Sequence, residues 1–231
     1  MGKKLILFDV DGTLVFSKGG VAPRIMAEVV AEQVGMPVPW TINDFVGNTD
    51  RNIIYTLLNR HGVREALIEK MTNQALENYL KKLEQELKKN DVITILAGVK
   101  PLLFALKSDE RFALGLLTGN MLRGAQLKLA KDDLFSFFPI GAFGDDALKR
   151  EQLPSVAIQR AEKYYGHFFN KTDIWIVGDS ISDIKCAHTN HLKCLAVASG
   201  HVKEEELAAY HPNALVKNLQ ETEKIIQILL T

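Results

Sequence analysis

Two carboxylates follow the first apolar stretch of the chain, in the segment Lys4–Val15 (KLILFDVDGTLV). Residues Leu5–Phe8 are all apolar, as in a buried strand, and Asp9 and Asp11 come where that strand has to end. Side chains two residues apart in extended backbone point to the same side. The pattern therefore predicts two acids facing one pocket, where close anions are stable if a cation lies between them or one is protonated for use.

The same residue types also occur in turns and helix caps, so the pair alone leaves catalysis and capping equally open. A calcium-binding loop of the EF-hand type is excluded, because that loop needs glycine at its sixth position and glutamate at its twelfth. Counted from Asp9, Gly12 is the fourth residue and Gly20 is the twelfth. A tight turn at Gly12, with backbone close to a ligand, fits the pattern better.

Composition excludes several other classes of protein. The 231 residues contain 28 Lys plus Arg and 28 Asp plus Glu, so no net charge indicates a nucleic-acid or anionic-membrane partner. No apolar run is long enough to span a bilayer, and the start of the chain does not resemble a secretory signal. The two cysteines, Cys186 and Cys194, lie in apolar surroundings; we expect buried thiols and a cytoplasmic location.

Short apolar runs alternate with helical patterns over most of the chain, which predicts a parallel sheet with helices on both faces. The expected strands are 4–9, 112–118, 173–179 and 193–199, with weaker candidates at 139–144 and 214–217. The expected helices are 99–107, 121–131, 153–165, 181–190 and 219–230. Such sheets bind ligands at the carboxyl ends of their strands.

One region interrupts this alternation. Between about 21 and 89 the sequence contains no convincing strand and three helical patterns, at 23–34, 49–61 and 64–89. The last is long and amphipathic, with Glu and Lys at helical spacing. We therefore predict an α/β, Rossmann-like parallel sheet core, residues 1–18 and 92–231, with an inserted all-helical cap domain, residues 19–91.

Further polar residues follow the other expected strands. WIVGDSISD (175–183) repeats the layout of a buried strand followed by acids, here Asp179 and Asp183. In LGLLTGN (114–120), Thr118 ends a strand, and a hydroxyl group with exposed backbone N–H groups can hold a phosphate. Arg150, with Lys149 as the alternative, provides a cation just before a helix. Taken singly, Asp183 could be an acid favoured by the helix dipole, Thr118 part of a turn, and Arg150 a surface charge. Taken together, these residues predict one site at one edge of the sheet.

This order of residues resembles the haloacid dehalogenase-like superfamily, whose first motif, Asp-x-Asp-Gly-Thr, matches Asp9–Thr13. The second motif matches Thr118, the fourth matches Gly178–Asp183, and Arg150 is our choice for the third. The usual Lys-Pro-x-Pro form of the third motif is missing. The helical insert resembles the cap of the phosphoglycolate phosphatase and β-phosphoglucomutase group, although many members have an acid where this chain has Phe16.

The resemblance implies phosphoryl transfer through an aspartyl-phosphate on Asp9. Asp11 would act as general acid and base, Thr118 and Arg150 would stabilise the transferring group, and Gly119 and Asn120 would complete its binding site. Mg²⁺ would be held by Asp9, the backbone carbonyl of Asp11, and Asp179, with Asp183 supporting it; these are our metal-site residues Asp9, Asp11, Asp179 and Asp183.

The predicted function is hydrolysis of a small-molecule phosphate monoester, with a sugar phosphomutase as the alternative. A non-enzymatic phosphate-binding protein is disfavoured by the intact acids, and a dehalogenase by the second acid of the first motif. In the insert, Gly47, Asn48 and Thr49 are candidates for substrate contact, although a helix cap at Asn48 or Thr49 explains them equally well. Trp40 and Trp175 are expected to serve packing. The sequence indicates neither the identity of the substrate nor the oligomeric state.

Overall fold

Six parallel strands form the central sheet of the protein, in a computed structural model that describes residues 2–89 and 91–231. The strand order is β5-β4-β1-β6-β7-β8, and every neighbouring pair is parallel. The strands are β1 (Lys4–Phe8), β4 (Phe112–Leu117), β5 (Ile140–Ala142), β6 (Ile174–Gly178), β7 (Lys193–Val197) and β8 (Ala214–Val216). All six correspond to strands that the sequence predicts, and the predicted α/β fold class is confirmed.

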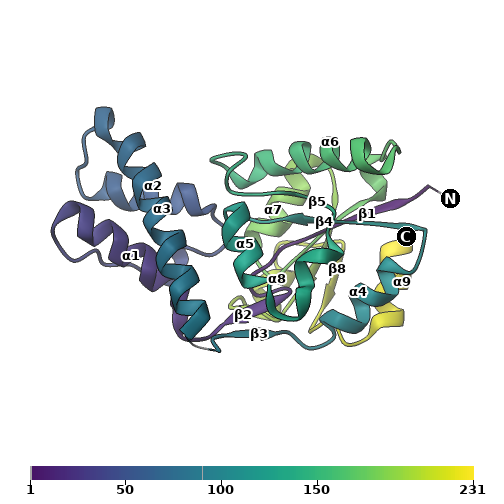
Figure 1. The fold of residues 1–231 in the computed structure, drawn as a ribbon. Coiled ribbons are helices and arrows are strands. Elements are labelled where there is room, and N and C mark those ends of the chain that lie inside the picture. Colours follow the sequence, from purple (N-terminus) through teal and green to yellow (C-terminus); the bar gives the residue numbers. More distant parts are fainter. Residues whose placement is uncertain (1, 90) are drawn as a thin grey trace.

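Helices cover both faces of this sheet (Figure 1). One face packs against α6 (Leu153–Tyr165) and α7 (Ile181–Asn190), and the other packs against α4 (Val99–Lys107), α5 (Leu122–Lys128) and α9 (Thr222–Leu230). Side chains of β1 alternate between the two apolar cores: Ile6 and Phe8 enter one core, and Leu5 and Leu7 enter the other. This alternation is the reason that the strand reads as a continuous apolar run.

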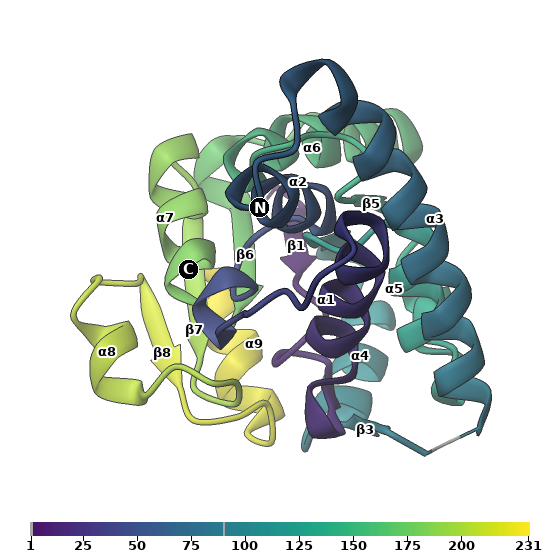
Figure 2. The ribbon, with the colours of Figure 1, turned by 90° about the vertical axis from the view of Figure 1, so that its left-hand side faces the viewer.

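Three helices form the insert between the first strand and the rest of the sheet: α1 (Val21–Val34), α2 (Asp50–Arg60) and α3 (Glu65–Lys89). They pack against one another around an apolar cluster of their own, which includes Met26, Leu57 and Tyr79. Figure 1 shows these helices at one end of the molecule, and Figure 2 views that end directly, with the insert in front of the sheet. The insert therefore has a core separate from the two cores of the sheet.

A small antiparallel sheet joins the insert to the central sheet. The chain leaves along β2 (Val15–Ser17) and returns along β3 (Ile93–Ile95), with Phe16 opposite Thr94. The sequence analysis predicted neither strand, nor the short helix α8 (Glu204–Ala208). It also placed the last helix too early, since α9 begins at Thr222 instead of at Leu219.

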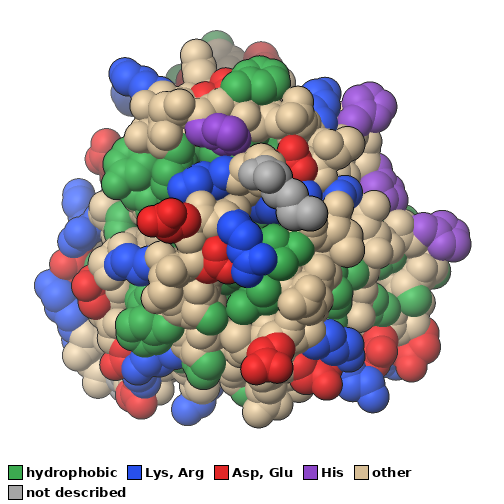
Figure 3. All heavy atoms as spheres, turned by 90° about the vertical axis from the view of Figure 1, so that its right-hand side faces the viewer, with side chains coloured by type: hydrophobic (Ala, Val, Ile, Leu, Met, Phe, Trp, Pro, Cys, Tyr) green, Lys and Arg blue, Asp and Glu red, His purple; other side chains and the backbone are tan. Residues whose placement is uncertain are grey.

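The face of the molecule away from the insert shows acidic and basic side chains interspersed, with no large area of one sign (Figure 3). This distribution agrees with equal numbers of acidic and basic residues in the chain. Within the described ranges, no helix combines the length and apolar character needed to cross a membrane.

Candidate active site

A cavity of about 300 Å³ lies where the insert meets the carboxyl edge of the sheet. Because β4, β1 and β6 are neighbours in the sheet, the residues that follow them also become neighbours. Thr118 follows β4, Asp9 and Asp11 follow β1, and Asp179 follows β6, and all four line the cavity. The structure thus brings together the acids and the hydroxyl group that the sequence predicts at one sheet edge.

Arg150 is the cation closest to the first acid. Its Nη2 atom lies 3.2 Å from Oδ2 of Asp9 and 2.5 Å from Oδ1 of Asp183, and it donates a hydrogen bond to the carbonyl oxygen of Leu117. The side chain is 5% exposed, and its Nε atom has no hydrogen-bond partner among the described residues. Lys149, the alternative cation, is exposed and does not line the cavity. The geometry therefore favours Arg150 over Lys149 for the third motif.

Asp183 is held by hydrogen bonds in the first turn of α7. Ser180 caps α7: its backbone N–H and its hydroxyl group donate to Oδ2 of Asp183 at 3.0 and 2.6 Å, and its hydroxyl oxygen accepts from the Asp183 backbone N–H at 3.2 Å. This reciprocal capping box satisfies two backbone N–H groups at the helix end. Asp183 is fully buried, and its other oxygen binds Arg150. The residue therefore orients Arg150 as well as capping the helix.

Two glycines make room for Asp179. Gly12 has a φ of 76°, in the left-handed region, and a Cβ atom at Gly12 or at Gly200 would collide with the Asp179 carboxylate. Thr13 donates a hydrogen bond to Oδ1 of Asp179 at 3.3 Å. Ser199 donates to the carbonyl oxygen of Gly12 at 2.7 Å, which ties the loop after β7 to the loop after β1. The glycine of the first motif is therefore required by the position of an acid from another strand.

The buried acids have the arrangement of a metal site. Carboxylate oxygens of Asp9, Asp179 and Asp183 lie within 4.8 Å of one another. Burial raises the pKa of Asp9 to about 6, although Arg150 opposes the shift. Burial, with the charges of Asp183 and Asp9, raises the pKa of Asp179 well above its usual range. When all three carboxylates are ionised, the single adjacent guanidinium group of Arg150 leaves an excess of negative charge, and a hard divalent cation with oxygen ligands fits this donor set.

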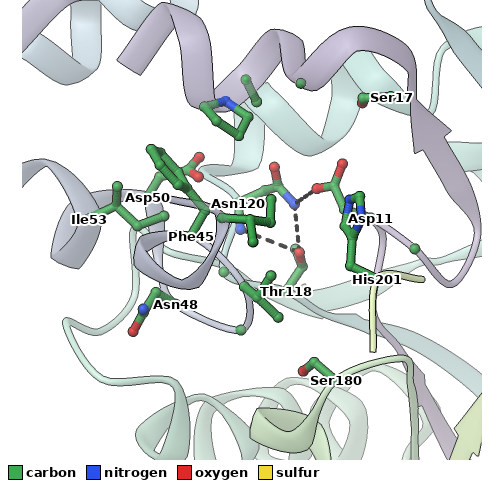
Figure 4. Close-up of a pocket in the computed structure, with 18 of the residues that line it drawn as sticks. Asp11, Ser17, Phe45, Asn48, Asp50, Ile53, Thr118, Asn120, Ser180 and His201 are labelled. Carbon is green, nitrogen blue, oxygen red and sulfur yellow. Dashed lines mark hydrogen bonds between the residues drawn. The ribbon is translucent and has the colours of Figure 1, made fainter. Parts of the chain in front are cut away.

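A second cation, Lys128, lies next to the second acid, and the sequence analysis did not identify it. Its Nζ atom lies 2.7 Å from Oδ2 of Asp11 and 2.6 Å from Oδ1 of Asn120, and its side chain is 3% exposed. Asn120 donates through Nδ2 to Asp11 and to Oγ1 of Thr118, each at 2.8 Å (Figure 4). Thr118 therefore accepts this bond and keeps its own O–H available as a donor to a ligand.

The loop before α2 covers the site. Gly47 and Asn48, two of the candidates for substrate contact, line the cavity, whereas Thr49 does not line it. Thr49 instead caps α2 by accepting from the Asn52 N–H at 3.1 Å, and it donates to the carbonyl oxygen of Leu148. A Cβ atom at Gly119 would collide with the carbonyl oxygen of Asn48, so the loops approach closely. Thr49 therefore has the helix-capping role that the sequence left open.

Asp50 is a further buried acid that the sequence analysis missed. It is 5% exposed and accepts a hydrogen bond from the Met121 N–H at 2.9 Å, while its own N–H donates to Gly119. Burial raises its pKa to about 7, although the charge of Lys128 opposes the shift. The residue joins the insert to the loop after β4.

The rim of the cavity is aromatic. Phe16, the residue at which this chain departs from the family pattern, lies with its ring 5.6 Å from that of His201, and both line the cavity. Trp175 is buried in the sheet, as predicted for a packing residue, whereas Trp40 is partly exposed and lines the cavity. The Trp40 ring is 5.4 Å from the Phe45 ring, at 84°.

The fold and the site together define an α/β protein with a carboxylate cluster at the carboxyl ends of parallel strands. The model of the family "haloacid dehalogenase-like hydrolase" matches residues 6–197. The chain therefore belongs to this family and is an enzyme of it. The resemblance drawn from the motifs is confirmed.

Named relatives and solved structures agree with this membership. The chain is 26% identical over 231 residues to a phosphoglycolate phosphatase from Mannheimia succiniciproducens, covering 96% of this chain and 98% of the relative. It is 24% identical over 219 residues to a phosphoglycolate phosphatase from Pseudomonas savastanoi, covering 94% and 77%. A crystal structure of a predicted phosphoglycolate phosphatase from Haemophilus somnus has a TM-score of 0.72 at 22% identity, covering 97% and 98%.

Proposed function

We propose that this enzyme is a Mg²⁺-dependent phosphatase that hydrolyses small-molecule phosphate monoesters through an aspartyl-phosphate on Asp9. The observation that carries the proposal is the convergence, in one cavity, of Asp9, Asp11, Thr118, Arg150 and Asp179. The names of the relatives, which are phosphatases, support the same reaction class. Their sequences are too distant to transfer a substrate.

Asp9 is the proposed nucleophile. A carboxylate attacks phosphorus when it is ionised and held in line, and the guanidinium group of Arg150, 3.2 Å away, favours the ionised form. Asp9, Asp179 and the backbone carbonyl of Asp11 would hold Mg²⁺, with Asp183 supporting Arg150. When bound, the ion would neutralise phosphate charge that otherwise repels the nucleophile. Arg150, which lines the cavity, would also balance the charge of the transferring phosphoryl group.

Asp11 is the proposed acid and base. It would protonate the leaving alkoxide and then accept a proton from the attacking water. Lys128 and Asn120 hold one of its oxygens, and this leaves the other oxygen available for proton transfer. The hydroxyl group of Thr118 and the N–H of Gly119 would bind phosphate oxygens, with Asn120 fixing the Thr118 rotamer.

We assign residues 1–18 and 92–231 to the core and residues 19–91 to a cap domain, with residues 1 and 90 outside the described ranges. The separate apolar cluster of α1, α2 and α3 supports this division, as do the two short connecting strands β2 and β3. The cap would exclude water in one step and admit it in the other. A cytoplasmic location is part of the proposal and is supported by two free, buried cysteines, Cys186 and Cys194.

The insert favours a hydrolase over a phosphomutase. A mutase has to hold a sugar phosphate for return transfer, which requires several donors on the cap. Arg24 pairs with Glu86, Arg51 with Glu69, and His61 bonds its own helix, so none of the three basic residues lines the cavity. A chain from Thermotoga maritima described as a candidate β-phosphoglucomutase has a similar fold, with a TM-score of 0.61 at 18% identity, but this likeness concerns the fold alone.

The test is release of inorganic phosphate by the purified enzyme with Mg²⁺ from phosphorylated sugars, glycolate, nucleotides, amino acids and simple alcohols. We expect turnover of at least one monoester by the wild type, and none by the Asp9→Asn variant. With a sugar 1-phosphate, conversion to the 6-phosphate in ³¹P NMR, with little phosphate released, would establish the mutase instead. Unchanged turnover by Asp9→Asn would contradict the nucleophile assignment.

A further inference from the structure

The walls of the cavity differ in chemistry. The side formed by the sheet edge carries the acids and the buried cations Lys128 and Arg150. The side formed by the insert, which we call the roof, is apolar; its main residues are Pro23, Met26, Trp40, Ile42, Phe45 and Ile53. Figure 4 places Phe45 and Ile53 on one side of the cavity and Asp11 and His201 on the other. A phosphate bound near Asp9 would therefore extend its leaving group toward the roof.

The polar side chains that the insert contributes to the cavity already have partners, and Ser17, at the end of β2, adds one hydroxyl group without a partner among the described residues. The amide of Asn48 donates to the carbonyl oxygen of Asp44 and accepts from Asn52, both at 3.2 Å. Asp50 accepts from the Met121 N–H, and as an acid it would repel an anionic leaving group. Among the described residues of the insert, no Lys, Arg or His lines the cavity. On the sheet side of the rim, the described residues add the exposed His201.

This arrangement is unsuitable for a charged or hydroxyl-rich leaving group. A carboxylate placed under the roof would lose water and meet no cation there, and sugar hydroxyls would lose water without gaining equivalent hydrogen bonds. An apolar group would instead exchange water for contact with aromatic and aliphatic side chains. The volume of about 300 Å³ is at the small end of ligand cavities, so it suits a phosphate with one ring or a short branched chain.

We propose that the preferred substrates are phosphate monoesters of small, uncharged, apolar alcohols, and that Phe45 is a main determinant of this preference. The inference rests on the proposed phosphatase function and names the substrate class of that same site. Phe45 is the residue to test because its ring lies against Trp40, so the two rings form one aromatic corner of the roof. A ring in the substrate could pack edge-to-face against either of them.

The experiment compares four monoesters of alkyl alcohols with Mg²⁺ present. Benzyl phosphate and n-propyl phosphate carry apolar groups; 2-phosphoglycolate is close in size to the propyl ester but anionic; glucose 6-phosphate carries hydroxyl groups. One methylene in an apolar pocket discriminates by roughly 10–200-fold, so we expect kcat/KM for benzyl phosphate to exceed that for phosphoglycolate and glucose 6-phosphate by at least about tenfold. Benzylphosphonate should likewise inhibit more strongly than phosphonoacetate.

Variants locate the preference in the roof. Phe45→Ala should lower the ratio of kcat/KM for benzyl phosphate to that for methyl phosphate by about tenfold, and Phe45→Arg should shift the preference toward phosphoglycolate. Phe168→Ala is the matched control, because Phe168 is 72% exposed and lies outside the cavity; its ratio should be unchanged. If the Phe45 variants do not fold, the wild-type panel and the two phosphonates still decide the question.

The outcomes separate this inference from the function on which it rests. Preference for the benzyl and propyl esters would support it. Preference for phosphoglycolate or glucose 6-phosphate would overturn it and leave the phosphatase assignment intact. Absence of phosphate release from the four esters and the wider panel would overturn both. An unchanged benzyl-to-methyl ratio in folded Phe45→Ala would overturn the role of Phe45.

Discussion

Lys128 shows how one residue connects packing to chemistry. It lies on α5 with a 3% exposed side chain, and its ammonium group is shared by the carboxylate of Asp11 and the amide oxygen of Asn120. A buried lysine is retained at low cost only when its charge is paired. The contacts of Lys128 thus fix the position of the proposed acid and base instead of merely stabilising the fold.

We predict that Lys128→Met lowers kcat/KM, which reports phosphoryl transfer and not the hydrolysis step common to all substrates, at least about tenfold with an alkyl phosphate, a part of the ~10²–10⁴-fold that general acid–base catalysis contributes. The loss should be smaller with acetyl phosphate, because its leaving group needs no proton. Steady-state kinetics with both substrates provide the check, and Lys171→Met, at an exposed position, is the control. Equal losses with the two substrates would show that Lys128 does not act through Asp11.

Asp50 should make stability depend on pH. Burial raises its pKa to about 7 in the folded protein, where Lys128, Asp11 and Asp145 are the charged groups that affect it most. A carboxyl group with a raised pKa binds its proton more tightly when folded, so its stabilising contribution is present at low pH and is lost as pH rises toward 7.

The Asp50→Asn variant should therefore match the wild type near pH 4 and become more stable than it by up to about 4 kcal/mol at pH 8, an upper limit from the size of the shift. Urea unfolding at several pH values measures the difference in free energy of unfolding. A difference that does not change with pH would contradict the raised pKa.

At the scale of elements, the insert behaves as a unit. Helices α1, α2 and α3 share one apolar cluster, and the chain enters and leaves them through β2 and β3 alone. We predict that replacing residues 19–89 by a short Gly/Ser bridge leaves a folded sheet domain that no longer discriminates among substrates. Circular dichroism and the substrate panel are the measurements. An unfolded product, or unchanged discrimination, would contradict the assignment of the cap.

The sequence allowed the six strands of the sheet to be predicted, because strands buried on both faces read as continuous apolar runs. It did not allow β2 and β3 to be predicted, because three-residue strands such as Val15–Ser17 carry too little pattern. Those two strands form because they pair with each other across the ends of the insert, a long-range contact that no local window contains.

Long-range contacts also explain why the sequence analysis missed Lys128 and the apolar roof of the site. Acids at strand ends could be predicted because the ends of neighbouring strands converge. Nothing in the sequence distinguishes Lys128 from the solvent-exposed lysines of the chain. Its side chain is buried because it pairs with Asp11, which is distant along the chain. The apolar roof is assembled from α1, α2 and the loop between them, so its composition became apparent only in three dimensions.

At the scale of the whole molecule, the site lies between the sheet domain and the insert, and the two contribute side chains of different polarity to it. The proposed catalytic and metal-binding acids belong to the sheet domain, and the insert covers them with a mainly apolar surface in which Asp50 is the one acid among the described residues. Burial, together with the charges of neighbouring carboxylates, raises the pKa values of Asp9 and Asp179. Cation binding should therefore control activity more strongly than any change in the insert.

We predict that exhaustive chelation abolishes phosphate release, that Mg²⁺ restores it, and that Ca²⁺ restores it poorly. A few oxygen ligands on one side suit octahedral Mg²⁺ with its remaining waters, whereas Ca²⁺ recruits extra oxygens and could bind Asp9 through both of its own. Activity assays after metal removal are the measurement. Full activity in the presence of a chelator, with metal content verified, would contradict this prediction.

The most direct test of the central claim is detection of the phosphoryl group on Asp9. Asp11→Asn protein, which should be slow to hydrolyse the intermediate, is mixed with acetyl phosphate and Mg²⁺, quenched in acid and digested with trypsin. We predict a peptide Leu5–Lys18 that carries one phosphoryl group at Asp9, and no such peptide from protein that also carries Asp9→Asn. Phosphate release by the wild type, with no phosphorylated Leu5–Lys18 at any time after mixing in either protein, would contradict the account.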